Sequence, residues 1–161
     1  MKNQREFIEI IKAHEGIIYK ITMLYADSKE DKEDLYQEIV YQMWKSFENF
    51  KGESKISTWI YRVALNTALT HLKKENRKVA QISFDSSLLQ VMDLKDSLLE
   101  EQIQLLYKHI KTLSSVERGI ILLFLENYSH KEISSITGFS VSNIGTRIGR
   151  IKQKLKTQMV K

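Results

Sequence analysis

An asparagine, two arginines and a lysine recur at steps of three or four residues between positions 143 and 154, a spacing that places them on one face of a helix. From residue 142 to residue 161 there are six basic residues and no acidic one. Such a face attracts DNA phosphates, and polar side chains near its start reach base edges. A solvated helix surface is the alternative for any charge run taken alone. The candidate DNA contacts are Ser142, Asn143, Thr146, Arg147, Arg150 and Lys154.

A short helix and a tight turn precede this basic face. Ser129 and Glu132 have the spacing of a capping box, which predicts that a helix starts there. Gly138 tolerates the left-handed backbone conformation and predicts the end of that helix. A final helix is predicted from about Ser140 or Ser142, with apolar residues along its back. This order of elements predicts a helix-turn-helix, which docks in the major groove of DNA.

A second basic segment, residues 51–78, interleaves aromatic, cationic and amide side chains. Stacking on exposed bases and reading of their edges require these groups. Two residues of this segment have more than one interpretation. Trp59 is in register with Val63, so spacing alone favours a core tryptophan over a stacking one. Asn66 is either a base contact or an ordinary helix-surface residue.

An acidic face precedes the basic segment. Asp34, Gln37 and Glu38 stand at i, i+3 and i+4 and therefore share one side of a helix. A cationic protein surface is one partner for such a face, although the spacing by itself favours plain exposure to solvent.

The composition excludes several classes of chemistry. The 161 residues contain no cysteine, and four histidines stand far apart, so neither a disulfide framework nor a metal site is expected. There is no glycine-rich phosphate loop or catalytic motif, so we expect no enzyme and no cofactor. No signal peptide or apolar span is present, which predicts a cytoplasmic protein without membrane insertion. The net charge of +5 comes from the C-terminal half and favours a polyanionic partner.

The periodicity of apolar residues predicts an all-α fold of two small helical domains, and the absence of proline agrees with it. Three helices are predicted in residues 1–78, one of them starting at Ser28, where Ser28 and Asp31 have the spacing of a capping box. The pattern fails in residues 79–97, which we interpret as a linker. Residues 98–161 form the second domain, in which a capping box at Ser114 and Glu117 precedes the helix-turn-helix.

Four stretches of the chain, taken in order, are similar to the motifs of one family. Residues 31–44, DKEDLYQEIVYQMW, resemble DAEDLVQEVFLRAW, and residues 50–66, FKGESKISTWIYRVALN, resemble the segment F…WLYRIARN. In the second half, residues 113–118, LSSVER, resemble LPEEER, and residues 128–138, YSHKEISSITG, resemble LSYEEIAEILG. The chain thus resembles, over nearly its whole length, an extracytoplasmic-function (ECF) sigma factor of the sigma-70 family.

The resemblance implies that the N-terminal domain binds the clamp helices of core RNA polymerase and opens the minus-ten element of promoter DNA. Asp34, Gln37 and Glu38 match positions of polymerase contact. Asn66 matches a position that holds a flipped base, assisted by the loop 50–55. The minus-ten DNA contacts expected are Lys55, Trp59, Arg62, Asn66, Lys73, Lys74 and Arg77.

The same resemblance implies that the C-terminal domain reads the minus-thirty-five element. The linker that connects the two domains then passes through the polymerase. Because no extension follows Lys161, we expect control by a separate anti-sigma factor. The protein is expected to be a monomer outside the holoenzyme.

One segment departs from the family pattern. Residues 140–152, SVSNIGTRIGRIK, stand where the family commonly has PVGTVKSRLHRAR, so the proline is absent and Gly145 and Gly149 replace long side chains. The alternative to a sigma factor is a stand-alone helix-turn-helix regulator, whose N-terminal domain would serve dimerisation or ligand binding. Such a regulator binds duplex DNA unaided, whereas a sigma factor binds promoters tightly only within the holoenzyme.

Overall fold

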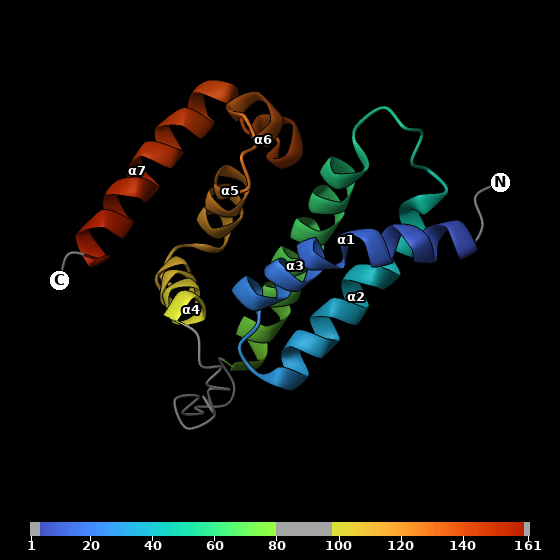
Figure 1. Cartoon of the computed structure of the whole chain (residues 1–161), viewed down its shortest axis with the longest axis horizontal. Coiled ribbons are helices and arrows are strands. Elements are labelled where there is room, and N and C mark those ends of the chain that lie inside the picture. The colour runs from blue at the N-terminus through green and yellow to red at the C-terminus, as the bar shows by residue number, and fades with distance from the viewer. Residues whose placement is uncertain (1–3, 80–97, 160–161) are drawn as a thin grey trace. The chain divides into compact units, whose positions relative to one another are not determined.

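The computed structural model describes residues 4–79 and 98–159, and within them the side chains of residues 75–79 and 98–100 are not described. Helices are the regular elements in these ranges (Figure 1). The all-α prediction is therefore confirmed for the described residues. The helices fall into two units, α1 to α3 and α4 to α7, and each is treated by itself. All of the predicted linker except Val79 lies outside the described residues, so its boundaries stay a prediction.

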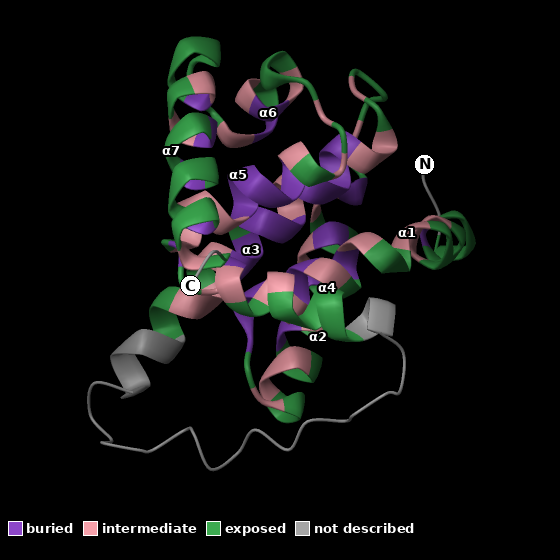
Figure 2. Ribbon diagram, turned by 60° about the vertical axis from the view of Figure 1, so that its left-hand side comes forward, coloured by how far each residue is buried: buried purple, intermediate pink, exposed green. Residues whose placement is uncertain are grey.

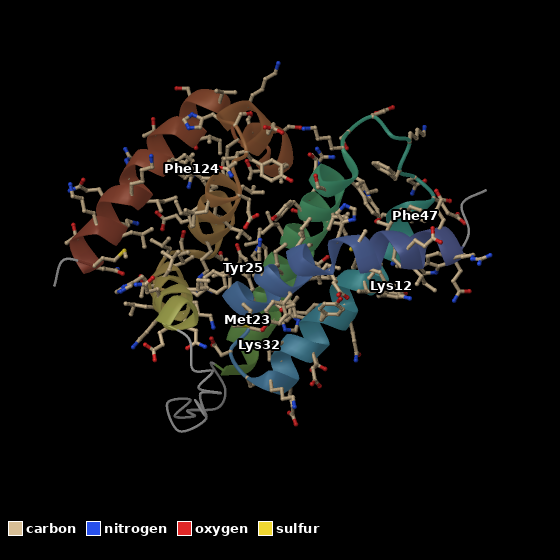
Figure 3. The ribbon with its side chains drawn as sticks, in the orientation of Figure 1. Lys12, Met23, Tyr25, Lys32, Phe47 and Phe124 are labelled. Carbon is tan, nitrogen blue, oxygen red and sulfur yellow. The ribbon has the colours of Figure 1, made fainter. Side chains whose placement is uncertain are left out.

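Unit 1 consists of α1 (Gln4–Tyr25), α2 (Lys29–Phe47) and α3 (Ile56–Val79), each packed against the other two. The α2 residues at four-residue steps, from Leu35 to Phe47, are buried as their spacing predicts. Phe47 closes one end of the core, with its ring centroid 5.3 Å from that of Phe7 (Figure 3). The three helices therefore bury one continuous apolar core.

The start of α2 combines one predicted and one unpredicted interaction. The backbone N–H of Asp31 donates to the Ser28 hydroxyl at 3.0 Å, as the capping pattern predicts. The carboxylate of Asp31 instead contacts Nε2 of His71 in α3 at 2.7 Å. Local capping thus sets where α2 begins, and a long-range contact attaches that end to α3.

Unit 2 consists of α4 (Leu98–Ile110), α5 (Ser115–Leu125), α6 (His130–Thr137) and α7 (Val141–Met159). The two capping boxes predicted in this unit are complete, at Ser114 with Glu117 and at Ser129 with Glu132, whereas at Ser28 the structure shows only the bond from the Asp31 N–H. Gly138 ends α6 with φ 86°, in the left-handed region that favours glycine. Figure 2 shows that α7 is buried along one side and exposed along the other.

The predicted apolar stripe of α4 is less buried than its periodicity suggests. Of the described α4 side chains only Ile110 is buried, and Ile103 is 44% exposed. This helix packs on α7, and His109 near its C-terminal end contacts Gln158 of α7. Leu106 and Tyr107 of the stripe are half-buried, so burial increases toward Ile110. None of the helices in the described ranges has the length and apolarity required to span a membrane.

Candidate functional site

The second helix of the predicted helix-turn-helix is α7. Four apolar residues, from Ile144 to Leu155, bury its inner side. The Ser140 hydroxyl accepts a hydrogen bond from the backbone N–H of Asn143 at 3.1 Å, so Ser140 caps the helix. The outer side of α7 is exposed and is formed by Ser142, Asn143, Thr146, Gly149 and Arg150. This side carries most of the predicted minus-thirty-five contacts.

Three cations of α7 are held by groups of the protein itself. Arg147 lies over the ring of Phe139, with its guanidinium carbon 4.3 Å from the ring centroid. The ammonium nitrogen of Lys152 lies 4.3 Å from the ring centroid of Phe124, which is labelled in Figure 3. Lys154 bonds to Glu117 of α5. The cationic face is therefore partly committed to contacts within unit 2.

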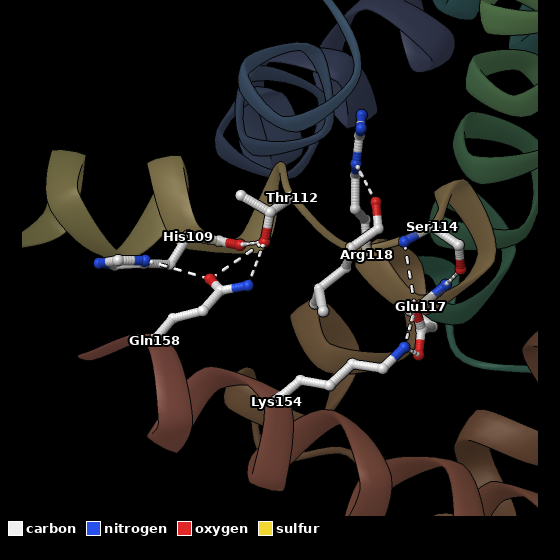
Figure 4. A network of polar contacts seen from close by, with 8 residues as sticks. His109, Thr112, Ser114, Glu117, Arg118, Lys154 and Gln158 are labelled. Carbon is white, nitrogen blue, oxygen red and sulfur yellow. Dashed lines mark hydrogen bonds and ion pairs between the residues drawn. The ribbon is translucent and has the colours of Figure 1, made fainter. Parts of the chain in front are cut away.

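Lys154 and Glu117 join α7 to the capping box of α5 (Figure 4). The Lys154 ammonium donates to both carboxylate oxygens, at 2.9 and 3.2 Å, and the backbone N–H of Ser114 donates to the same carboxylate at 3.1 Å. Burial alone would raise the pKa of Glu117, but the hydrogen bonds from Lys154 and Ser114 outweigh it and lower that pKa. Lys154, predicted as a DNA contact, thus has a structural role in unit 2.

A second polar cluster in Figure 4 fastens the far end of α7 to α4. The side-chain oxygen of Gln158 lies 3.2 Å from Nδ1 of His109 and accepts from the Thr112 hydroxyl at 3.1 Å. These contacts hold the C-terminal end of α7 to the rest of unit 2. The outer side of α7 is exposed in its N-terminal half.

Trp59, one of the predicted minus-ten contacts, is buried in unit 1. Its side chain is only 7% exposed, and its ring centroid lies 5.1 Å from that of Phe50 and 6.0 Å from that of Phe47. A ring enclosed in this way has no free face on which a base can stack. Trp59 is therefore a core residue, as its register with Val63 indicates, and its ring is not available for the stacking role that the minus-ten assignment implies.

Asn66 lies at an open hollow between α2 and α3. The hollow has a volume of about 360 Å³, and its lining combines amide, hydroxyl, ammonium and apolar groups. Asn66 itself is exposed. The lining residues are Gln42, Lys45, Ser46, Asn49, Val63, Asn66 and Thr67. The hollow therefore offers several hydrogen-bonding groups around one exposed amide.

The remaining cationic candidates of unit 1 differ in exposure. Lys55, Lys73 and Lys74 are exposed, and Arg62 is half-buried with interactions inside the protein. The side chain of Arg77 lies outside the described residues. The three exposed lysines leave ammonium groups at the surface on either side of Asn66 along the chain.

The acidic face of α2, defined by Asp34, Gln37 and Glu38, is exposed as predicted. Glu38 accepts a hydrogen bond from Nε2 of Gln42 at 3.0 Å, and Gln42 also lines the hollow at Asn66. Tyr41, one turn beyond Gln37, is 54% exposed. Tyr41 is not among the residues predicted for this face, although its four-residue step from Gln37 places it on the same side of the helix.

Comparison with known proteins gives the same two units. Residues 10–78 match sigma-70 region 2, and residues 103–155 match sigma-70, region 4. The ECF RNA polymerase sigma-E factor of Escherichia coli (strain K12) is 23% identical over 169 residues, which cover 98% of this chain and 88% of that protein. The RNA polymerase sigma factor SigV of Bacillus subtilis (strain 168) is 26% identical over 160 residues, covering 96% and 91%.

Two solved structures share the fold. The sigma factor RpoE of Bartonella quintana, crystallised with the anti-sigma factor NepR, matches with a TM-score of 0.75 and 19% identity, over 97% of this chain and 95% of that one. CnrH, in complex with the cytosolic domain of CnrY, matches with a TM-score of 0.68 and 19% identity, over 98% and 89%. The all-helical fold of this chain is thus found in both of these proteins.

Proposed function

Because the chain belongs to the sigma-70 family, in its extracytoplasmic-function class, we propose that it binds core RNA polymerase through α2 and selects promoters by contacts at two DNA elements. It is a sigma factor of transcription initiation and not an enzyme. A stand-alone helix-turn-helix regulator leaves the match of residues 10–78 to sigma-70 region 2 unexplained.

The polymerase contact is assigned to the acidic face of α2. Asp34, Gln37 and Glu38 are exposed on one side of a helix whose opposite side is buried. Two carboxylates and an amide suit a cationic partner surface, since complementary charge directs association. Tyr41 extends this face with an exposed ring, and aromatic residues are enriched at protein interfaces.

The minus-ten contact is assigned to the hollow at Asn66, and this hollow is the observation that carries the proposal. An extruded base needs hydrogen-bonding groups for its pairing edge and space beside the helix, and the hollow offers both. Lys55, Lys73 and Lys74 are exposed and supply charge for the DNA backbone, with Arg62 and Arg77 as further candidates. Trp59 takes no part, because it is buried.

The minus-thirty-five contact is assigned to the exposed side of α7. Ser142, Asn143, Thr146 and Arg150 are accessible there. Gly149 adds no side chain, and a Cβ at this position would meet nothing within 4 Å. Base reading therefore depends on short polar groups near the start of α7, while Lys154 is held by Glu117.

We also assign an anti-sigma factor as a partner. The structure of RpoE contains the anti-sigma factor NepR. The structure of CnrH contains the cytosolic domain of CnrY. In unit 2, Ile103 and Leu105 of α4 are exposed and offer apolar side chains to such a partner.

Co-purification with core polymerase tests the assignment of α2. Asp34→Lys with Glu38→Lys is expected to abolish co-purification with core polymerase, because repulsion replaces attraction. Glu9→Lys with Glu101→Lys makes the same change of net charge at exposed residues elsewhere and serves as the control. Unchanged assembly of the first variant, with normal helical content, would refute the assignment of α2.

A further inference from the structure

Two independent contacts hold the side chain of Arg147. Its Nε donates to Oδ1 of Asn143, one turn earlier in α7, at 2.6 Å. Its guanidinium carbon lies 4.3 Å from the centroid of Phe139, a residue of the turn between α6 and α7. A hydrogen bond fixes one edge of the planar group and the ring supports one face, so the guanidinium has a defined orientation.

The contacts leave the binding edge of Arg147 available. A guanidinium carries five N–H donors, of which the Nε–H is used by Asn143. The terminal nitrogens form the fork that binds two oxygens of a phosphate at once. Because the orientation is already set, less rotamer freedom is lost when that fork binds.

The position of Arg147 on α7 indicates which part of DNA it meets. It directly precedes Ile148 and follows Ile144 by three residues, and both isoleucines are buried. Arg147 is itself half-buried, so it lies at the border between the inner and outer sides of the helix. When a recognition helix enters the major groove, its central exposed residues face the bases and its borders face the backbone.

We propose that Phe139 and Asn143 are positioning residues that orient Arg147 to grip a DNA phosphate at the rim of the major groove. The inference rests on the proposed function of α7 and deepens it. Asn143 then acts through Arg147 as well as by its own amide N–H groups. Phe139, which no motif singles out, becomes part of the DNA-binding surface without touching DNA.

A double-mutant cycle in the full chain tests the inference. The probe is a short fluorescein-labelled DNA duplex of mixed sequence, because a phosphate contact is independent of sequence. Arg147→Ala is expected to weaken binding about 5- to 20-fold and to flatten the salt dependence by about one unit. Phe139→Leu is expected to weaken binding about 2- to 5-fold in the wild-type background and to add nothing to Arg147→Ala.

The control pairs Phe139→Leu with Lys156→Ala. Lys156 is an exposed cation of the same helix, so its loss removes a charge without removing Arg147. The two effects are expected to multiply in this pair. An effect of Phe139→Leu that is equal with and without Arg147 would overturn the inference, because Phe139 would then act on the fold or on DNA directly.

A DNA-free measurement checks the orientation of Arg147. The bond to Asn143 predicts a slowly exchanging Nε–H signal of Arg147 in NMR spectra, lost in Asn143→Ala. Fast exchange in the wild-type chain would overturn the inference. Promoter-dependent transcription by core polymerase with the wild-type chain tests the proposed function separately. If transcription occurs and the cycle shows no coupling, the inference fails and the proposed function stands.

Discussion

Nε2 of His71 in α3 lies 2.7 Å from Oδ1 of Asp31 in the first turn of α2, across forty residues of sequence. Their side chains are 13% and 24% exposed, so the contact is largely withdrawn from water. Asp31 also stands where a negative charge favours the helix dipole. The pair therefore attaches the N-terminal end of α2, which leads into the acidic face, to the helix that carries Asn66.

Removal of this pair should destabilise unit 1. His71→Ala is expected to lower the free energy of unfolding by about 1 to 2 kcal/mol, since a largely buried carboxylate loses its partner. Both tryptophans, Trp44 and Trp59, belong to unit 1, so urea unfolding followed by tryptophan fluorescence reports this unit. Lys73→Ala, at an exposed position of the same helix, should change stability little. Equal stability of wild type and His71→Ala would show that the contact contributes nothing.

Glu117 should make the stability of unit 2 depend on pH. Its pKa is lowered in the folded protein, so its contribution is present above the ordinary glutamate value and is lost as the pH falls through the lowered one. Glu117→Gln is expected to cost about 0.5 to 1 kcal/mol at neutral pH and to lose less stability than wild type on acidification. NMR signals of unit 2 residues followed in urea at several pH values measure this. Parallel pH curves for both proteins would contradict the prediction.

Gly149→Ala should stabilise α7. Glycine inside a helix costs about 1 kcal/mol relative to alanine, and an added Cβ at Gly149 meets no atom within 4 Å. The melting temperature of unit 2 is therefore expected to rise. At Gly145 the added Cβ would lie 3.6 Å from Nδ1 of His130, an ordinary contact, so Gly145→Ala should also stabilise the helix. A fall in stability in either variant would indicate that the helix backbone is distorted there.

Asn66→Ala should impair promoter opening at the minus-ten element. If its amide pairs with an extruded base, its loss removes about 1 to 3 kcal/mol, so transcription on a duplex promoter falls roughly 5- to 150-fold. A template with a pre-melted bubble should recover the cost of melting but should still lack discrimination at the flipped position. Thr70→Ala, at an exposed position one turn away, is the matched control. Unaltered discrimination among the four bases in Asn66→Ala would make Asn66 a plain surface residue.

Much of the fold could be predicted because its signals are local. Ser114, Ser129 and Gly138 act within three or four residues of their own positions, through caps and a left-handed turn. The buried stripes of α2 and α7 follow from the helical period alone. The all-α class, the helix starts and the helix-turn-helix were therefore determined by the sequence itself.

Tertiary packing decided which partner each polar or aromatic side chain takes. Lys154 has the spacing of a DNA-facing cation, yet it bonds to Glu117 across 37 residues, and Asp31 meets His71 across forty. Trp59 stands among DNA-binding residue types, yet Phe47 and Phe50 enclose it. Helical spacing states which residues share a face, but the face that becomes buried, and the group opposite it, depend on how distant helices pack together.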